Sequence, residues 1–435
     1  MVKRRRVQVI LACIVIPLLL ATLVGLFALW PKDTSKVRSL PIIGADSSVA
    51  EGTVSDLHVA KCKPKELSHI DDSVLGTPEL ADKKRVLGLA PGADLTGDSL
   101  RESIIQDLGT DAASISLLRF AVCAKVTKGE GRGQVMPVSV PREVLANGIS
   151  VGDRIQMIYN PSSRAQGTAY HFWDFKRGYE VGFLAFLYVA LVLAVARLKG
   201  GAALVGLLGS VGVIGVFTVP SLLDAHSPLL VAIVSASAMM FISVYLAHGI
   251  SIRTTTALLG TFAGLVITFL LAAWGVSASN LTGASEEITL GLVAELRGLS
   301  LQQILLAGMV VAGLGALNDV TITQASSVWE LHAANPRMSR RAIWVSAMRI
   351  GSDHIASTVY TLAFAFVGAG LPLIMYAFMT DRPALDTLLS ASIAEEVVRT
   401  LVASIGLIAS IPLTTAVGAA LVHVAPRKAE TQELA

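Results

Sequence analysis

The pattern of apolar and polar residues along the chain predicts eight membrane-spanning helices. Eight apolar segments approach or exceed the length of about 20 residues that a helix needs to cross a bilayer. They run approximately over Val7–Trp30, Tyr179–Leu198, Ala202–Val219, Pro228–Ala247, Thr254–Val276, Leu301–Val320, Ile355–Phe378 and Val397–Val424. Only 15% of the residues are charged and 53% are hydrophobic, whereas soluble domains carry about 25% charged residues. The fold class is therefore an α-helical polytopic membrane protein.

The basic residues between these segments predict the orientation in the membrane. Lys3-Arg4-Arg5-Arg6 precedes the first span, which favours a cytoplasmic N-terminus. Eight crossings also place Arg253 and the basic loop 337–349 in the cytoplasm. We expect a bacterial plasma membrane protein with both termini cytoplasmic and residues 31–178 extracytoplasmic. The first apolar run exceeds a signal-peptide core, so we interpret it as an uncleaved anchor.

Four regions follow from this topology. They are the anchor at 1–30, an extracytoplasmic domain at 31–178, a seven-helix bundle at 179–424 and a cytoplasmic tail at 425–435. In the extracytoplasmic domain, strands are predicted at Ser114–Thr127, Gln134–Val140 and Arg154–Tyr159, with turns at the glycines between them. This pattern predicts a small β-rich domain of the OB type or a similar barrel. The aromatic run 171–177 predicts an anchoring juxtamembrane helix.

The cysteines fit an oxidising location for this domain. Cys62 and Cys123 both lie in it, which favours a disulfide between them. The alternative is two unpaired thiols, because a sequence does not give the Cα distance that a disulfide requires. Cys13 lies in the first span and is interpreted as a lipid-facing residue.

A polar run interrupts the apolar pattern at the end of the sixth segment. Asp319 lies about 18 residues into it, or roughly 27 Å along a helix axis, toward the cytoplasmic side. Ionisable groups at membrane depth are unfavourable unless they face a cavity or a partner. The seventh segment opens with a second polar group. The candidate ion- or substrate-binding residues are Asn318, Asp319, Thr321, Thr323, Gln324, Asp353 and His354.

These residues suggest separate roles. Asp319 would bind a cation or carry a proton, and His354 would exchange a proton or ligate a metal. The neutral residues would supply oxygen and amide contacts to a solute. The alternative is that Asn318 and Asp319 end the sixth helix and cap the next segment, positions that short polar residues favour.

Motifs of several other function classes are missing from the sequence. It contains no His-Glu-x-x-His, no Cys-x-x-Cys and no Walker-type phosphate loop. We therefore expect no metal site, no cofactor and no enzymatic activity. A net charge of +3 is too small to suggest nucleic acid as a partner.

Two stretches of the sequence have an unusual composition for membrane helices. They are Gly315–Leu331, with the sequence GALNDVTITQASSVWEL, and Arg349–Leu362, with the sequence RIGSDHIASTVYTL. On these two motifs the chain resembles the YibE/F family of bacterial multi-pass membrane proteins. The resemblance covers most of the chain from Tyr179 to Val424. The length and the extracytoplasmic cysteine pair are similar to those of actinobacterial members. The resemblance implies this architecture and carries no established catalytic residue.

Three functions remain open at this point. The first is a transporter or permease for an unknown small solute or ion, with its polar site near the cytoplasmic side of the bundle. The second is an accessory or scaffold protein whose outer domain binds a membrane or envelope partner. The third is a membrane-embedded enzyme that uses Asp319, Asp353 and His354. All three place the chain in contact with the lipid bilayer.

Overall fold

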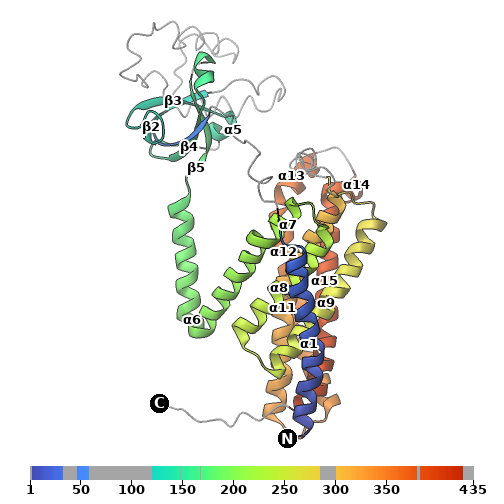
Figure 1. Ribbon diagram of the computed structural model, residues 1–435. Helices are drawn as coiled ribbons and strands as arrows, with labels where there is room; N and C mark the ends of the chain where they lie inside the picture. Colours follow the sequence, from blue (N-terminus) through green and yellow to red (C-terminus); the bar gives the residue numbers. More distant parts are fainter. Residues whose placement is uncertain are drawn as a thin grey trace. The chain divides into compact units, whose positions relative to one another are not determined.

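The structure, a computed structural model, consists of two compact units (Figure 1). One comprises Leu40–Tyr188, and the other comprises Met1–Ser39 together with Val189–Ala435. The residues that the structure describes are 2–32, 47–57, 120–146, 148–166, 168–284, 300–379 and 383–424. The predicted tail at 425–435 lies outside them.

Five strands in the smaller unit form a closed barrel. They are β1 (Ser48–Asp56), β2 (Phe120–Lys128), β3 (Val135–Val140), β4 (Arg154–Tyr159) and β5 (Tyr170–Phe175). The order around the barrel is β1-β2-β3-β5-β4, and β4 pairs with β1 to close it. β3 and β5 are parallel, and the other pairs are antiparallel. α5 (Arg142–Ala146) connects β3 to β4, and η4 (Pro161–Gln166) connects β4 to β5.

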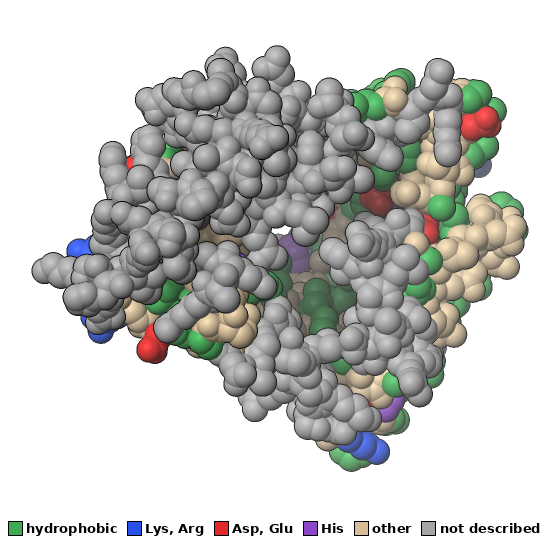
Figure 2. Space-filling view, turned by 90° about the horizontal axis from the view of Figure 1, so that it is seen from above, with side chains coloured by type: hydrophobic (Ala, Val, Ile, Leu, Met, Phe, Trp, Pro, Cys, Tyr) green, Lys and Arg blue, Asp and Glu red, His purple; other side chains and the backbone are tan. Residues whose placement is uncertain are grey.

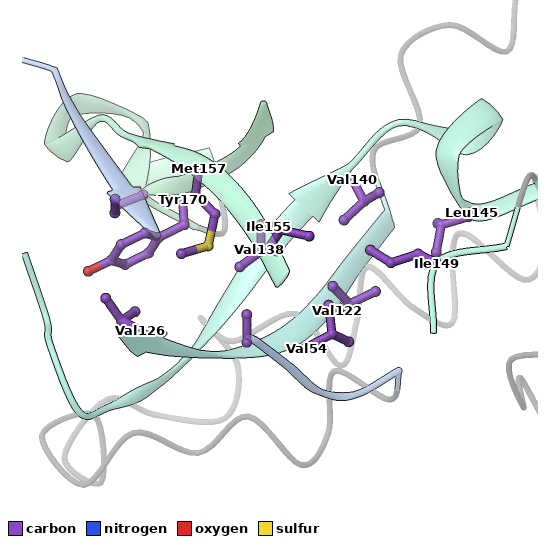
Figure 3. Close-up of a cluster of buried hydrophobic side chains, with 13 residues drawn as sticks. Val54, Val122, Val126, Val138, Val140, Leu145, Ile149, Ile155, Met157 and Tyr170 are labelled. Carbon is purple, nitrogen blue, oxygen red and sulfur yellow. The ribbon is translucent and has the colours of Figure 1, made fainter. Parts of the chain in front are cut away.

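The barrel has its own hydrophobic core because alternate residues of a strand point to the same side. In β2, Val122, Ala124 and Val126 are buried, whereas Lys125 is exposed. Figure 3 shows the resulting cluster, with Tyr170 toward one end of it. The predicted strands Gln134–Val140 and Arg154–Tyr159 are confirmed as β3 and β4. The described part of Ser114–Thr127 is confirmed as β2, whereas residues 114–119 lie outside the described residues. β1 was not predicted. The prediction of a juxtamembrane helix was wrong, because residues 170–175 pair with β4 as a strand.

The larger unit is helical. It contains α1 (Val2–Ala28), most of α6 (Gly178–Val213), the π-helix η5 (Ile214–Thr218), α7 (Val219–Leu223), α8 (Pro228–His248), α9 (Ile252–Ala278), α11 (Leu301–Ala334), α12 (Arg340–Ala369), α13 (Leu371–Met379), α14 (Ala384–Leu388), α15 (Ala391–Leu421) and the 3-10 helix η6 (Val422–Val424). α9, α11 and α15 pack on one another at its centre. α8 packs on α11, and α12 packs on α15 and α11.

Six helical stretches of the described chain are long and apolar enough to cross a membrane. They are Arg5–Ala28, Gly178–Leu223, Pro228–His248, Ile252–Ala278, Leu301–Ala334 and Ala391–Leu421. The predicted seventh span, Ile355–Phe378, is not among them. Gly370 separates α12 from α13 within this span, so only the residues up to Ala369 belong to α12. The residues of α12 that directly precede the span include the polar Asp353 and His354. A multi-pass membrane architecture is therefore supported, and the predicted count of eight is not confirmed.

The predicted second and third spans lie within one helical stretch, Gly178–Leu223. α6 is broken at Arg197, whose φ of 47° and ψ of −129° are not helical. The chain turns back sharply there (Figure 1). A Cβ atom at Gly200 would lie 2.6 Å from the backbone oxygen of Val192, so this close return requires glycine.

Glycines also bring the central helices together. A Cβ atom at Gly260 of α9 would lie 1.9 Å from Oγ1 of Thr414 on α15, and one at Gly264 would lie 2.9 Å from Cβ of Ser410. Small residues allow helix backbones to approach in this way where lipid supplies no hydrophobic driving force.

Figure 2 shows one face, where charged side chains of the described residues appear only as scattered points.

Candidate functional site

The polar run lies inside a continuous helix. α11 extends from Leu301 to Ala334 through Asn318 and Asp319 without a break. The alternative that these two residues end the helix and cap the next one was therefore wrong. The cap of α12 is Ser339, whose hydroxyl accepts a hydrogen bond from the backbone N–H of Ala342 at 3.2 Å.

Two contacts give the depth of the run. The side-chain amide of Asn318 donates to Oγ of Ser243 on α8 at 3.3 Å, and Oγ1 of Thr321 lies 2.6 Å from Oγ1 of Thr261 on α9. α8 has 21 residues, so it is about 31 Å long, close to the thickness of a bilayer core. Ser243 lies five residues before its end at His248, or roughly 8 Å along the axis. The run is thus within the span, near the His248 end of α8.

Gln324 joins three helices. Its side-chain amide on α11 donates to Oγ1 of Thr415 on α15 at 2.7 Å and to the backbone oxygen of Ala347 on α12 at 2.9 Å. A Cβ atom at Gly351 would lie 3.1 Å from its Oε1 atom, so a larger residue there would crowd Gln324. Gln324 is 2% exposed. Because both hydrogen bonds that its side-chain amide donates are made within the protein, we interpret Gln324 as a structural residue of the bundle.

The interior that these contacts define is polar and mainly uncharged. Thr321 is fully buried, as are hydroxyl residues of α9 and α15 that contribute to the same interior, namely Thr254, Thr256, Thr261, Thr268, Ser410, Thr414 and Thr415. Most of these hydroxyls bond to a backbone oxygen of their own helix, as Thr415 does to Ile411 at 2.7 Å. Hydroxyl and amide groups paired in this way are tolerated at membrane depth without a charge.

The acidic candidates lie elsewhere. Asp319 and Asp353 are both exposed on the surface of the bundle, and Thr323 is half-buried. The hydroxyl of Thr323 donates to the backbone oxygen of Asp319 at 2.9 Å and so does not reach its carboxylate. The structure therefore does not bring the two carboxylates into the buried polar interior with Thr321 and Gln324.

His354 lies near the level of Asp319. α12 follows α11 after a short turn and runs antiparallel to it, with Gly351 beside Gln324. Counting five residues back from Gln324 therefore places Asp319 level with the turn of α12 that contains His354. His354 is half-buried, and its Nε2 atom has no hydrogen-bond partner in the described structure. Oδ1 of Asn318 is buried and unpartnered in the same way.

An unpartnered buried polar atom is unfavourable by about 1–3 kcal/mol. Two such atoms near the level of Asp319 indicate that this region offers polar groups with which water or a solute can form hydrogen bonds. The sequence interpretation did not identify Ser243 and Thr261, which hold Asn318 and Thr321. A single serine or threonine in an apolar helix carries no signal of its own, because its role depends on the opposing helix.

The described residues contain no group of three or more His, Cys, Asp or Glu side chains that could hold a metal ion. Among the cysteines, Cys13 is free and exposed, and Cys123 is buried in β2 and disulfide-bonded. Cys62 lies outside the described residues, so its pairing with Cys123 stays a prediction.

Comparison with known proteins addresses the bundle. No characterised protein and no solved structure matches this chain. The model of the YibE/F-like protein family matches residues 184–424, which is more than half of the chain and includes both motifs. The matching model describes the family as a whole and not its actinobacterial members in particular, so the actinobacterial-type assignment stays a prediction. The chain belongs to the YibE/F-like family.

Proposed function

We propose that this YibE/F-like protein is a transporter or permease in a bacterial plasma membrane. The observation that carries the proposal is the position of Asp319 within a membrane span, next to Asn318 in the sequence and near the level of His354, two residues that each have an unpartnered buried polar atom. Asp319 would take up a cation or a proton, since a carboxylate at membrane depth attracts positive charge. Asn318 and His354 would contact the solute or its water.

The proposed topology has eight crossings with both termini in the cytoplasm. The stretch Gly178–Leu223 has 46 residues, or about 69 Å as a straight helix, which is too long for one crossing. The break at Arg197 supports two crossings there. α12 and α13 together supply the other additional crossing. The site then lies near the cytoplasmic end of the bundle, because Ser243 is close to the end of α8 that precedes Arg253.

The test is charge movement in proteoliposomes on a supported membrane. Protons, monovalent and divalent cations, anions and amino acids are applied in turn to wild type and to Asp319→Asn. We expect one solute class to produce a current that the variant abolishes, with both proteins equally folded. Glu330→Gln is the matched control, because Glu330 is an exposed acid near the end of the same helix. An absence of current with every solute, or an undiminished current in Asp319→Asn, contradicts the proposal.

The second candidate is an accessory protein that acts through the extracytoplasmic barrel. The observation that favours it is the barrel itself. We infer an OB-type barrel from the closed order β1-β2-β3-β5-β4 with a helix between β3 and β4, and such barrels bind ligands on their strands and loops. An accessory protein would retain its activity in Asp319→Asn and lose it when residues 33–176 are replaced by a flexible linker. A membrane-embedded enzyme would instead require both Asp319 and His354 and be insensitive to membrane potential.

A further inference from the structure

The exposed face of α11 carries a charge where a single copy of the chain would meet lipid. Asp319 is exposed and, by its distance from the end of α8, lies inside the bilayer core. An acidic side chain that faces lipid inside the bilayer core is unfavourable, by up to about 2.5–3.5 kcal/mol at its centre on insertion scales. Another protein surface covering this face would remove the carboxylate from lipid and supply donors to it.

The same face is shaped for a close helix contact. Gly308, Ala312 and Gly315 are exposed and lie on the Asp319 side of α11, at positions that recur every three or four residues. A Cβ atom at Gly308 or Gly315 would have no neighbour within 4 Å. At Gly260, by contrast, such an atom would meet α15. The free space beside Gly308 and Gly315 is therefore not used by a described helix of this chain.

The exposed face of α12 offers complementary groups at the same depth. Ser357 is exposed, and the antiparallel register set by Gln324 and Gly351 places it level with about Asn318, next to Asp319. In a two-fold dimer with its axis along the membrane normal, residues at equal depth meet and every contact occurs twice. The carboxylate of Asp319 accepts hydrogen bonds and the hydroxyl of Ser357 donates them, so two identical faces satisfy each other.

We propose that a second copy of this chain docks on the exposed faces of α11 and α12, with Asp319 of each copy accepting a hydrogen bond from Ser357 of the other. The stripe Gly308, Ala312 and Gly315 allows the two α11 helices to approach. The dimer follows from the membrane location and the exposed groups, whereas its link to solute movement rests on the proposed transporter function. The site around Asp319 is then completed by the second copy.

Disulfide cross-linking of the full chain in its membrane tests the contact. Gly315→Cys is placed in a Cys13→Ser background and oxidised, and the product is run on a non-reducing gel. We expect a strong dimer band. Leu270→Cys is the matched control, since Leu270 is 59% exposed on α9 and lies outside the proposed interface. Cys13→Ser alone shows any band that Cys62 and Cys123 produce. Equal bands from Gly315→Cys and Leu270→Cys overturn the proposal.

The mass of the particle gives an independent answer. Particles are extracted directly from the membrane into polymer-bounded nanodiscs, and their protein mass is measured. We expect two copies for wild type and one copy for Gly315→Leu. A Cβ atom at Gly315 has no neighbour within 4 Å in a single copy, and an unchanged helical content confirms that the variant is folded. One copy for wild type, or one copy together with a different protein, overturns the proposal.

The experiments distinguish a failure of the proposed dimer from a failure of the proposed transporter function. A dimer that gives no current with any solute contradicts transport and leaves the interface intact. A single copy whose current depends on Asp319 contradicts the interface and leaves transport intact.

Discussion

Gln324 on α11 donates a hydrogen bond to Thr415 on α15, with 2.7 Å between Nε2 and Oγ1. The two residues lie far apart in the sequence, yet both are buried. The same amide also reaches Ala347 on α12. One side chain of the family motif therefore ties together three helices.

Replacing Gln324 by Ala is expected to destabilise the bundle. The change removes the two hydrogen bonds that the Gln324 amide donates to Thr415 and to the backbone oxygen of Ala347, so we expect a loss of about 1–3 kcal/mol. Thermal unfolding in detergent measures the effect. Thr323→Ala, one residue away and half-buried, serves as control. Equal melting temperatures for the two variants would argue against a structural role of Gln324.

The pair Thr261 and Thr321 should behave as a coupled unit. Their hydroxyl oxygens are 2.6 Å apart, and both residues are fully buried. Each single Thr→Val change leaves one hydroxyl without this partner, whereas the double change removes both and should be close to neutral. A double-mutant cycle of unfolding measurements should give a coupling of about 0.5–2 kcal/mol. Purely additive effects would mean that the hydroxyl contact contributes nothing.

Gly260→Ala is expected to separate α9 from α15. The added Cβ atom would lie 1.9 Å from Oγ1 and 2.9 Å from Cβ of Thr414, so one helix must move. We expect a loss of about 1–3 kcal/mol through overpacking, seen as a lower melting temperature. Gly212→Ala on α6 is the control, because its Cβ atom would have no neighbour within 4 Å. The prediction fails if the two variants unfold at the same temperature.

The barrel should lose some stability in acid through Glu51. A hydrogen bond from Lys176 lowers the pKa of this carboxyl below its ordinary value of 4.5, with help from the charges of Lys176 and Lys128, although slight burial opposes the shift. A folded-state pKa below the unfolded one gives a stabilisation that is fully present above pH 4.5 and lost as the pH falls through the folded pKa.

Because these side chains are close to solvent, the effect should stay below about 1 kcal/mol. Hydrogen exchange of β1, corrected for intrinsic rates, measures it between pH 3 and pH 6 in wild type and Glu51→Gln. The difference between the two proteins should shrink toward the acidic end. A difference that is constant across this range would exclude the pair as the cause.

The disulfide prediction is tested by counting accessible thiols. If Cys62 pairs with Cys123, a thiol reagent should label only Cys13 in the unfolded, unreduced chain and all three cysteines after reduction. Mass spectrometry identifies the labelled residues. Reduction should also lower the stability of the barrel by about 2–4 kcal/mol. Labelling of Cys62 without a reductant would show that Cys62 is not the partner of Cys123.

The sequence by itself determined the class of the protein, the two-part organisation and the location of the motifs. Runs of apolar residues are a local property, so the membrane class and most of the spans could be predicted from them. Alternation in Gln134–Val140 and Arg154–Tyr159 predicted two strands for the same reason. The segment Tyr170–Phe175 was misinterpreted, because its strand forms only by pairing with β3 and β4.

Only the tertiary structure decided which candidate residues lie in the buried interior of the bundle and which lie on its surface. Asn318, Asp319, Thr321 and Gln324 are adjacent in one helix, and the sequence treats them as one polar group. A helix turns 100° at each residue, so they point toward different neighbours. Thr321 meets Thr261, Gln324 meets Thr415, and Asp319 is exposed on the surface of the bundle. Which neighbour lies on each side depends on the packing of helices that are distant in the sequence.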